Sequence, residues 1–98
     1  MYSYVNINNV IVSYSYVLTE NDKIYYINIE NVKGNNSAKI SRLAKYVCEY
    51  KKTLKDLIFI IEERCNLPYY IVTYNNINVI YVMSKKAYNR NKHIFDLL

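Results

Sequence analysis

The sequence contains very little glycine, proline, histidine or cysteine, and no tryptophan. Gly34 and Pro68 are the only residues of their kinds among 98, and the one histidine is His93. A glycine-rich phosphate-binding loop is excluded, because such a loop needs several glycines close together. His93 with Cys48 and Cys65 also falls short of the four ligands of a zinc site built from histidine and cysteine. We therefore expect no metal ion and no cofactor.

Long apolar runs are absent as well. The longest aliphatic or aromatic run is Leu57–Ile61, whereas a membrane-spanning helix needs about 20 apolar residues. Residues 1–19 lack the basic start and continuous apolar stretch of a secretory signal, so we expect a cytoplasmic protein with no membrane partner. A hydrophobic content of 52%, with 15% aromatic residues, excludes a disordered chain. The length predicts a single domain over residues 1–98.

Four residue types are strongly over-represented: thirteen tyrosines, fourteen asparagines, thirteen isoleucines and ten lysines. Their codons consist almost entirely of A and T, which indicates an AT-rich genome. In composition alone, the chain resembles small proteins encoded by AT-rich viruses, including viruses of archaea. We therefore expect an origin in a virus or mobile element, which would place the protein inside a host cell.

Alternating apolar residues predict three strands in the first thirty residues. Two strands fall within Met1–Leu18 around a turn at Asn8-Asn9, and a third spans Lys23–Glu30 after a turn at Thr19–Asp22. Asparagine suits these turns because it tolerates positive φ better than other residues with a side chain.

A stripe of apolar residues at three- and four-residue spacing predicts one long helix over Ser37–Cys65, with Asn36 or Ser37 as its N-cap. The stripe consists of Ile40, Leu43, Ala44, Val47, Tyr50, Leu54, Leu57, Ile58, Ile61 and Cys65. A break near Lys51–Thr53, with Thr53 capping a second helix, is the alternative. Because the stripe keeps its phase through that point, we favour one helix. Pro68 should prevent it from continuing past Leu67.

The last third of the chain predicts a hairpin followed by a short helix. The hairpin joins Tyr69–Tyr74 to Ile77–Met83 around Asn75-Asn76, and Ser84 is the predicted cap of a helix running toward Leu98. The order is βββ-α-ββ-α. The sequence therefore predicts an α+β domain, with a mostly antiparallel sheet of about five strands packed on one long amphipathic helix.

The excess positive charge lies on the two predicted helices. Between Ser37 and Lys55, six basic residues stand against Glu49 alone: Lys39, Arg42, Lys45, Lys51, Lys52 and Lys55. Such a basic face favours contact with nucleic-acid phosphates or another anionic partner. The other explanation is a solvated face that keeps the protein soluble, and for phosphate contact alone we favour this one. A second group, Lys85, Lys86, Arg90 and Lys92, either contacts phosphates or forms a charged tail, and we favour the tail.

Two features point to assembly. The hairpin between Tyr69 and Met83 has no charged side chain, so it should be central in the sheet or paired across a dimer. Phe59 and Ile60 lie off the main apolar stripe, so the C-terminal helix or another protein should cover them. We expect a homodimer. The tyrosines also suit a base-stacking surface, although their strand propensity explains most of them.

The sequence gives little support for catalysis. His93 has no clear carboxylate partner, and Cys48 and Cys65 would lie about 25 Å apart on one helix, too far for a disulfide. Asp22, Glu30 and Lys33 weakly resemble the acidic and lysine residues of metal-dependent nucleases. The Glu-x-x-Lys spacing, however, would place the lysine on the opposite face of the strand.

We therefore expect a small non-enzymatic binding protein that docks on a host macromolecule, such as a defence or regulatory complex that it inhibits. The alternative is a nucleic-acid-binding protein that uses the basic face of the long helix.

Overall fold

The computed structural model describes residues 3–95 and confirms the α+β class. The predicted strand residues Met1 and Tyr2, and the predicted helix end at Leu98, lie outside this range. In chain order the elements are β1 (Ser3–Ile7), β2 (Val10–Tyr14), β3 (Tyr16–Glu20), β4 (Lys23–Ile29), α1 (Asn35–Glu49), α2 (Leu54–Phe59), a π-helical turn η1 (Ile60–Arg64), β5 (Tyr69–Tyr74), β6 (Ile77–Val82) and α3 (Lys85–Phe95).

The strands form two sheets, which corrects the prediction of one sheet of about five strands. A four-stranded sheet has the order β3-β4-β6-β5, and β1 and β2 form a separate hairpin. The predicted second strand breaks at Ser15, whose N–H donates to the Ile27 carbonyl at 2.8 Å. The chain leaves its partner β1 there and pairs with β4 instead. The sheet is also mixed, because β4 and β6 are parallel.

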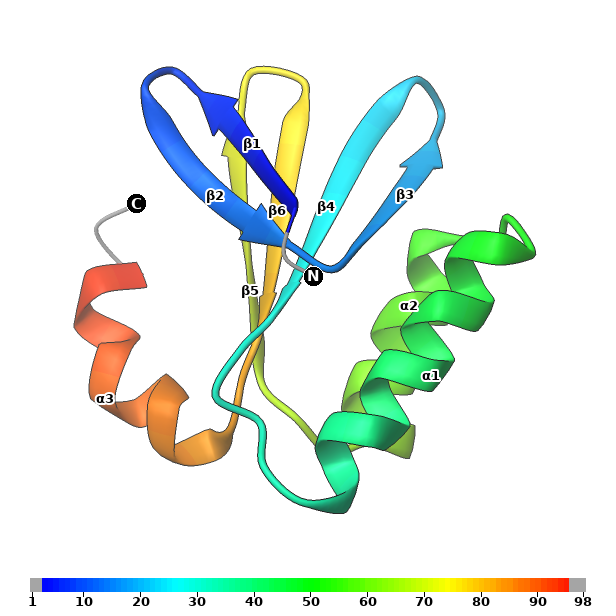
Figure 1. Ribbon diagram of the computed structural model, residues 1–98, viewed down its shortest axis with the longest axis vertical. Coiled ribbons are helices and arrows are strands. Elements are labelled where there is room, and N and C mark those ends of the chain that lie inside the picture. The colour runs from blue at the N-terminus through cyan, green and yellow to red at the C-terminus, as the bar shows by residue number, and fades with distance from the viewer. Residues whose placement is uncertain (1–2, 96–98) are drawn as a thin grey trace.

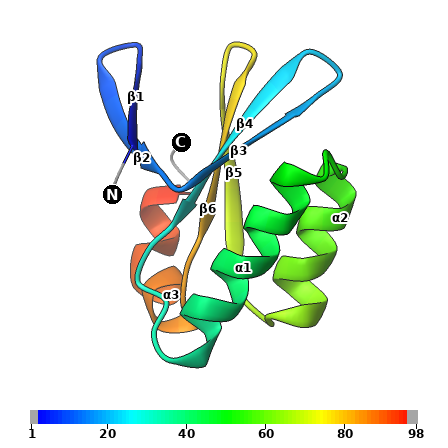
Figure 2. The same ribbon diagram turned by 45° about the vertical axis from the view of Figure 1, so that its right-hand side comes forward.

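Both faces of the four-stranded sheet are covered. In Figures 1 and 2, α1 and α2 lie on one face, and the hairpin β1–β2 and α3 lie on the other. We call α1, α2 and η1 the helical layer. The main core lies beneath it and includes the fully buried Ile27 and Ile80 on the central strands. A smaller core, Ile7, Val12 and Val79, lies between the β1–β2 hairpin and the opposite face of the sheet.

The prediction of one helix over Ser37–Cys65 is wrong, and the alternative break is observed. After α1 the chain turns through Lys51, which has φ +50°, and Thr53 caps α2. The connection holds about as many residues as one helical turn, so the apolar stripe keeps its phase although the helix stops. A straight helix of about 43 Å would overrun the sheet, whereas two shorter segments both cover it. The first helix also begins earlier than predicted, with Gly34 as its N-cap.

The end of the helical layer is a wide π-helical turn. The N–H of Cys65 donates to the Ile60 carbonyl, and that of Leu67 donates to the Ile61 carbonyl, each at 2.9 Å. Ile61, Cys65 and Leu67 are all buried at this turn, and Ile60 packs against the same core. The helical layer ends before Pro68, as predicted.

Asparagine takes the backbone positions for which glycine is usually selected, as predicted. Asn8 and Asn9, and likewise Asn21 and Asp22, have positive φ and form two-residue hairpin turns; Asn75 begins the turn between β5 and β6. The predicted cap of the last helix is confirmed too. The hydroxyl of Ser84 accepts from the Ala87 N–H at 3.1 Å.

Candidate functional site

The structure divides the predicted basic face into two groups. Arg42 and Lys45 project from α1 on the side opposite the buried Ile40, Ala44 and Val47, because each helical residue turns the chain by about 100°. Lys51, Lys52 and Lys55 are exposed around the turn between α1 and α2. Lys39 does not belong to either group, since its Nζ donates to the backbone carbonyl of Arg64.

Exposed aromatic side chains accompany these cations on the helical layer. The rings of Tyr46 and Tyr50, on α1 and at its C-terminal end, lie 4.7 Å apart between centroids. Phe59 lies opposite Leu57 and Ile61 on the second helical segment and is 55% exposed. We call Arg42, Lys45, Tyr46, Tyr50 and Phe59 the docking surface.

Phe59 and Ile60, which we predicted as one interface pair, have different surroundings. Ile60 packs against the main core, so the chain's own fold accounts for it. Phe59 is not covered by α3, because that helix lies on the other side of the sheet (Figure 1). Of the pair, only Phe59 is exposed.

Acidic side chains also lie on the helical layer. Glu49 pairs with Lys45 at 3.8 Å, and Asp56, Glu62 and Glu63 are exposed on α2 and η1. The layer therefore presents a mixture of signs around the docking surface rather than a uniformly positive field.

The uncharged strand β5 lies at an edge of the sheet, whereas its hairpin partner β6 is central. The Met83 N–H donates to the Pro68 carbonyl at 3.2 Å. Because hydrogen-bonding direction alternates along an antiparallel strand, the backbone groups of residues 70, 72 and 74 face β6. Those of Tyr69, Ile71 and Thr73 point to the open edge.

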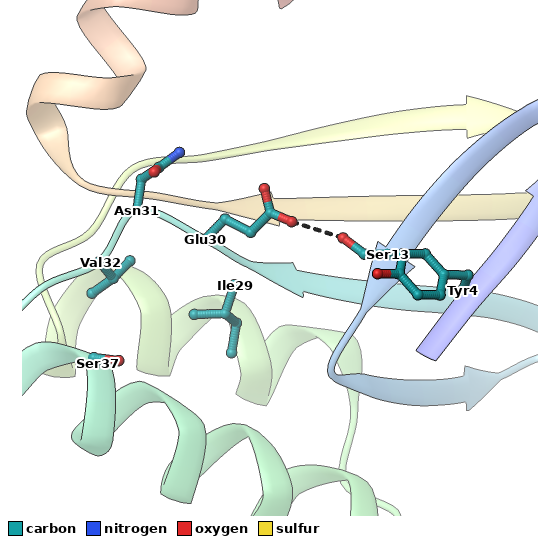
Figure 3. A pocket seen from close by; sticks show the side chains of 7 residues that line it. All are labelled: Tyr4, Ser13, Ile29, Glu30, Asn31, Val32 and Ser37. Atoms are coloured by element: carbon teal, nitrogen blue, oxygen red, sulfur yellow. Dashed lines mark hydrogen bonds between the residues drawn. The ribbon is translucent and has the colours of Figure 1, made fainter. Parts of the chain in front are cut away.

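A hollow of about 610 Å³ lies between the β1–β2 hairpin and the start of α1, and Glu30 lies at its centre (Figure 3). The Glu30 Oε1 accepts from the Ser13 hydroxyl at 2.7 Å and from the Asn28 amide at 3.1 Å. The carboxylate is thus held by two neutral donors. These three side chains tie the hairpin to β4, and no histidine or lysine lines the hollow to complete a catalytic group.

The candidate nuclease residues do not converge. Asp22 lies in the turn before β4 and Glu30 directly follows that strand, so the strand separates them by roughly 25 Å. Lys33 lies beyond Glu30 and lines a different pocket. Within residues 3–95 there is no cluster of three or more histidine, cysteine or acidic side chains that could hold a metal ion.

The two cysteines and the histidine are also apart from any site. Cys48 and Cys65 are free thiols, and burial is the main factor that raises the pKa of each. His93 is exposed on α3. We predicted reduced thiols, and both thiols are free. The reason given for that prediction was wrong, because Cys48 and Cys65 do not lie on one long helix.

One group of cations that we had treated as a charged tail takes part in a pocket. Lys86 and Arg90 of α3 lie beside Lys33, which follows β4, around a space of about 360 Å³. The spacing of Lys86 and Arg90 placed them on one helix face in the sequence. Nothing in the sequence placed Lys33 beside them, because their meeting depends on the path of residues 30–34.

Comparison with known proteins finds no family model, no curated protein and no solved structure that matches the chain. None of the helices within residues 3–95 is both long enough and apolar enough to cross a membrane.

Proposed function

We propose that this protein is a small non-enzymatic binding protein that docks on another protein through the docking surface. The observation that supports this proposal most is that Tyr46, Tyr50 and Phe59 are all exposed on the helical layer, which also carries the exposed Arg42 and Lys45. Tyrosine, phenylalanine and arginine are the residue types enriched in protein interfaces. The bias toward amino acids whose codons are rich in A and T supports a virus or mobile element as the source, so the partner would be a protein in the cytoplasm of the host cell.

Charge complementarity indicates the chemistry of that partner. The docking surface carries Arg42 and Lys45, with Lys51, Lys52 and Lys55 at its end. A complementary partner would offer an apolar patch for the aromatic rings and acidic residues at its rim. Glu49, Asp56, Glu62 and Glu63 on the same layer would repel a polyanion such as DNA, which is why we favour a protein over nucleic acid.

Capture from a host-cell extract, with and without nuclease treatment, tests this proposal. Wild-type protein should retain a specific host protein, and Tyr50→Ala and Phe59→Ala should each lose it. Tyr4→Ala is the matched control, because Tyr4 is 63% exposed but lies on the β1–β2 hairpin. Equal retention by all variants would refute the docking surface, and loss of the captured protein on nuclease treatment would indicate a nucleic-acid bridge.

The nucleic-acid alternative has its own measurement. Affinity for duplex DNA should be weak and unsaturable at ~0.15 M salt under our proposal. A saturable affinity that falls steeply with salt, and is lost in Lys45→Glu and Lys52→Glu, would establish the alternative instead.

We further propose that the chain forms a homodimer through β5. The outward N–H and carbonyl groups of Tyr69, Ile71 and Thr73 would pair with the same groups of a second copy, antiparallel and centred on Ile71. An antiparallel pair of identical strands is self-complementary, so each outward donor meets an outward acceptor. No charged side chain on β5 opposes this pairing.

Light scattering over a range of protein concentrations tests the dimer. The wild type should be dimeric and Ile71→Lys monomeric. Ile11→Lys is the control, because Ile11 is even more exposed but lies on β2. Phe59→Lys should leave the dimer intact, since Phe59 belongs to the docking surface. A monomeric wild type, or a dimer that survives Ile71→Lys, would contradict pairing through β5.

A further inference from the structure

A second surface, away from the docking surface, brings three cations together around a pocket. Lys33, Lys86 and Arg90 line it, together with Asn31, Ser84 and Ala87. Its volume of about 360 Å³ lies within the range of small-molecule sites, roughly 300 to 1,000 Å³. All of its ionisable lining residues are basic, and the remaining polar ones, Asn31 and Ser84, are both able to donate hydrogen bonds.

The path of residues 30–34 builds one wall of this pocket. Asn31 has φ +58° and Gly34 has φ +71°, so the chain turns sharply on either side of Lys33. In Figures 1 and 2 this segment passes beside the first turn of α3. The turns bring Lys33 to Lys86 and Arg90, which are more than fifty positions further along the sequence.

The other wall is the first turn of α3. Ser84 fixes this turn, because its hydroxyl accepts from the Ala87 N–H and its carbonyl accepts from the Tyr88 N–H at 2.9 Å. Lys86 and Arg90 are four residues apart and share one face of the helix. The pocket also lies at the positive end of the helix dipole, which adds to the field of the side chains.

These cations are not neutralised by the described part of the chain. Within residues 3–95 the one ion pair between side chains is Lys45–Glu49, on the helical layer. Glu30, the carboxylate nearest to Lys33 in the sequence, accepts hydrogen bonds from Ser13 and Asn28 instead. The adjoining hollow adds Lys85 beside Lys33 and Ser84. Like charges gathered in this way repel one another, and an anion in the pocket would relieve that repulsion.

We propose that this basic pocket binds a phosphomonoester group. The Arg90 guanidinium offers paired N–H donors that match two phosphate oxygens, and Lys33 and Lys86 supply two further charges. The hydroxyl of Ser84 and the amide of Asn31 are neutral donors to the remaining oxygens. A free nucleotide and the 5′-phosphate of a nucleic-acid strand both carry this group, and the experiment distinguishes them.

Titration calorimetry with adenosine 5′-monophosphate at ~0.15 M salt is the primary test. We expect saturable binding at one site, weakened at least about tenfold by Arg90→Gln and by Lys33→Gln. Lys92→Gln is the matched control, since Lys92 is exposed on the same helix but does not line the pocket. It should bind within about twofold of the wild type.

Two further titrations test whether the phosphate is what the pocket recognises. One uses adenosine, and the other uses short single-stranded DNA with and without a 5′-phosphate. Adenosine should not bind, because it lacks the phosphate. Binding of the 5′-phosphorylated strand but not of the nucleotide, with the same loss in Arg90→Gln, would support the proposal and assign the phosphate to a strand end. Absence of saturable binding to both, equal binding of the unphosphorylated strand, or an equal loss in Lys92→Gln would overturn it.

Discussion

Thr53 and Asp56 hydrogen-bond to each other's backbone at the start of α2. The Thr53 hydroxyl accepts from the Asp56 N–H at 3.1 Å, and the Thr53 N–H donates to Asp56 Oδ2 at 3.0 Å. Glu20, at the end of β3, accepts from the Leu54 N–H at 2.8 Å. A helix as short as α2 is marginal by itself, so these bonds help to fix where it begins.

Replacing Thr53 with alanine should destabilise the protein by about 1 kcal/mol, the usual effect of losing an N-cap side chain. The free energy of unfolding in urea measures this. Thr53→Ser keeps the hydroxyl and should stay within a few tenths of a kcal/mol of the wild type. An alanine variant as stable as the wild type would show that the cap contributes nothing.

The same cap should respond to pH. Hydrogen bonds from the backbone and then the side chain of Thr53 lower the pKa of Asp56 below its ordinary value of 3.8. A carboxyl whose pKa is lower in the folded state stabilises the protein above the unfolded-state value, and this contribution disappears as the pH falls through the folded value. The stability difference between wild type and Asp56→Ala should thus be constant near neutral pH and shrink below about pH 4. A difference independent of pH down to pH 2 would contradict this assignment.

The sequence predicted the local elements better than their assembly. Hairpin turns at Asn8-Asn9 and Asn75-Asn76, and the cap at Ser84, depend on neighbouring residues and were recoverable. The helix break was not favoured, because the connection before Thr53 preserves the apolar phase. No turn-forming residue adjoins Ser15, so the local sequence does not mark where the chain stops pairing with β1 and begins to pair with β4. That change depends on a hydrogen bond to Ile27, twelve positions further along the chain.

In the candidate site, too, features that depend on neighbouring residues could be predicted, whereas those that depend on the assembled fold could not. Exposure of Phe59 was readable from its helical phase, whereas Ile60, which also lies off the apolar stripe, is partly buried against the main core. The basic pocket was hidden, because Lys33 reaches Arg90 through two left-handed residues and not through any periodicity.

The buried Asn28 should be important for attaching the β1–β2 hairpin. Its amide lies 2.7 Å from the Ser13 carbonyl and 2.9 Å from the Ser13 hydroxyl. Asn28→Ala leaves these acceptors without that donor and should destabilise the protein by about 1–3 kcal/mol. Hydrogen exchange should accelerate most in β2. The control Asn76→Ala, in an exposed turn, should leave β2 unchanged, and uniform acceleration in Asn28→Ala would argue against a local role.

Lys51 should be a position where glycine stabilises the protein. Its φ of +50° is unfavourable for a residue with a side chain, and glycine is preferred just after a helix for that reason. After allowance for the greater freedom of glycine in the unfolded chain, Lys51→Gly should gain roughly 0.5–1 kcal/mol in denaturant unfolding. Lys52→Gly, at a position without positive φ, should be neutral or destabilising. A loss of stability in Lys51→Gly would contradict the expectation.

Both thiols should react slowly in the folded protein. Burial, mainly, raises the pKa of Cys48 and Cys65, so a smaller fraction of each is thiolate at pH 8 than in the unfolded chain. A colorimetric disulfide reagent should therefore modify the native protein more slowly than the protein in urea. Single Cys48→Ala and Cys65→Ala variants assign the two rates, and equal rates in native and unfolded protein would refute the prediction.

The parallel pairing of β4 with β6 has a consequence for how the chain acquires its structure. More than half of the chain separates Ile27 from Ile80, which lie opposite one another at the centre of the sheet. The hairpins β1–β2 and β3–β4 both leave the ribosome long before β6, the strand that pairs with β4. Closing so long a loop makes folding slow compared with a purely local topology. Until β6 has been synthesised, the nascent protein therefore exposes tyrosine-rich strands, and in this interval it depends most on chaperones or rapid synthesis of β6 to avoid aggregation.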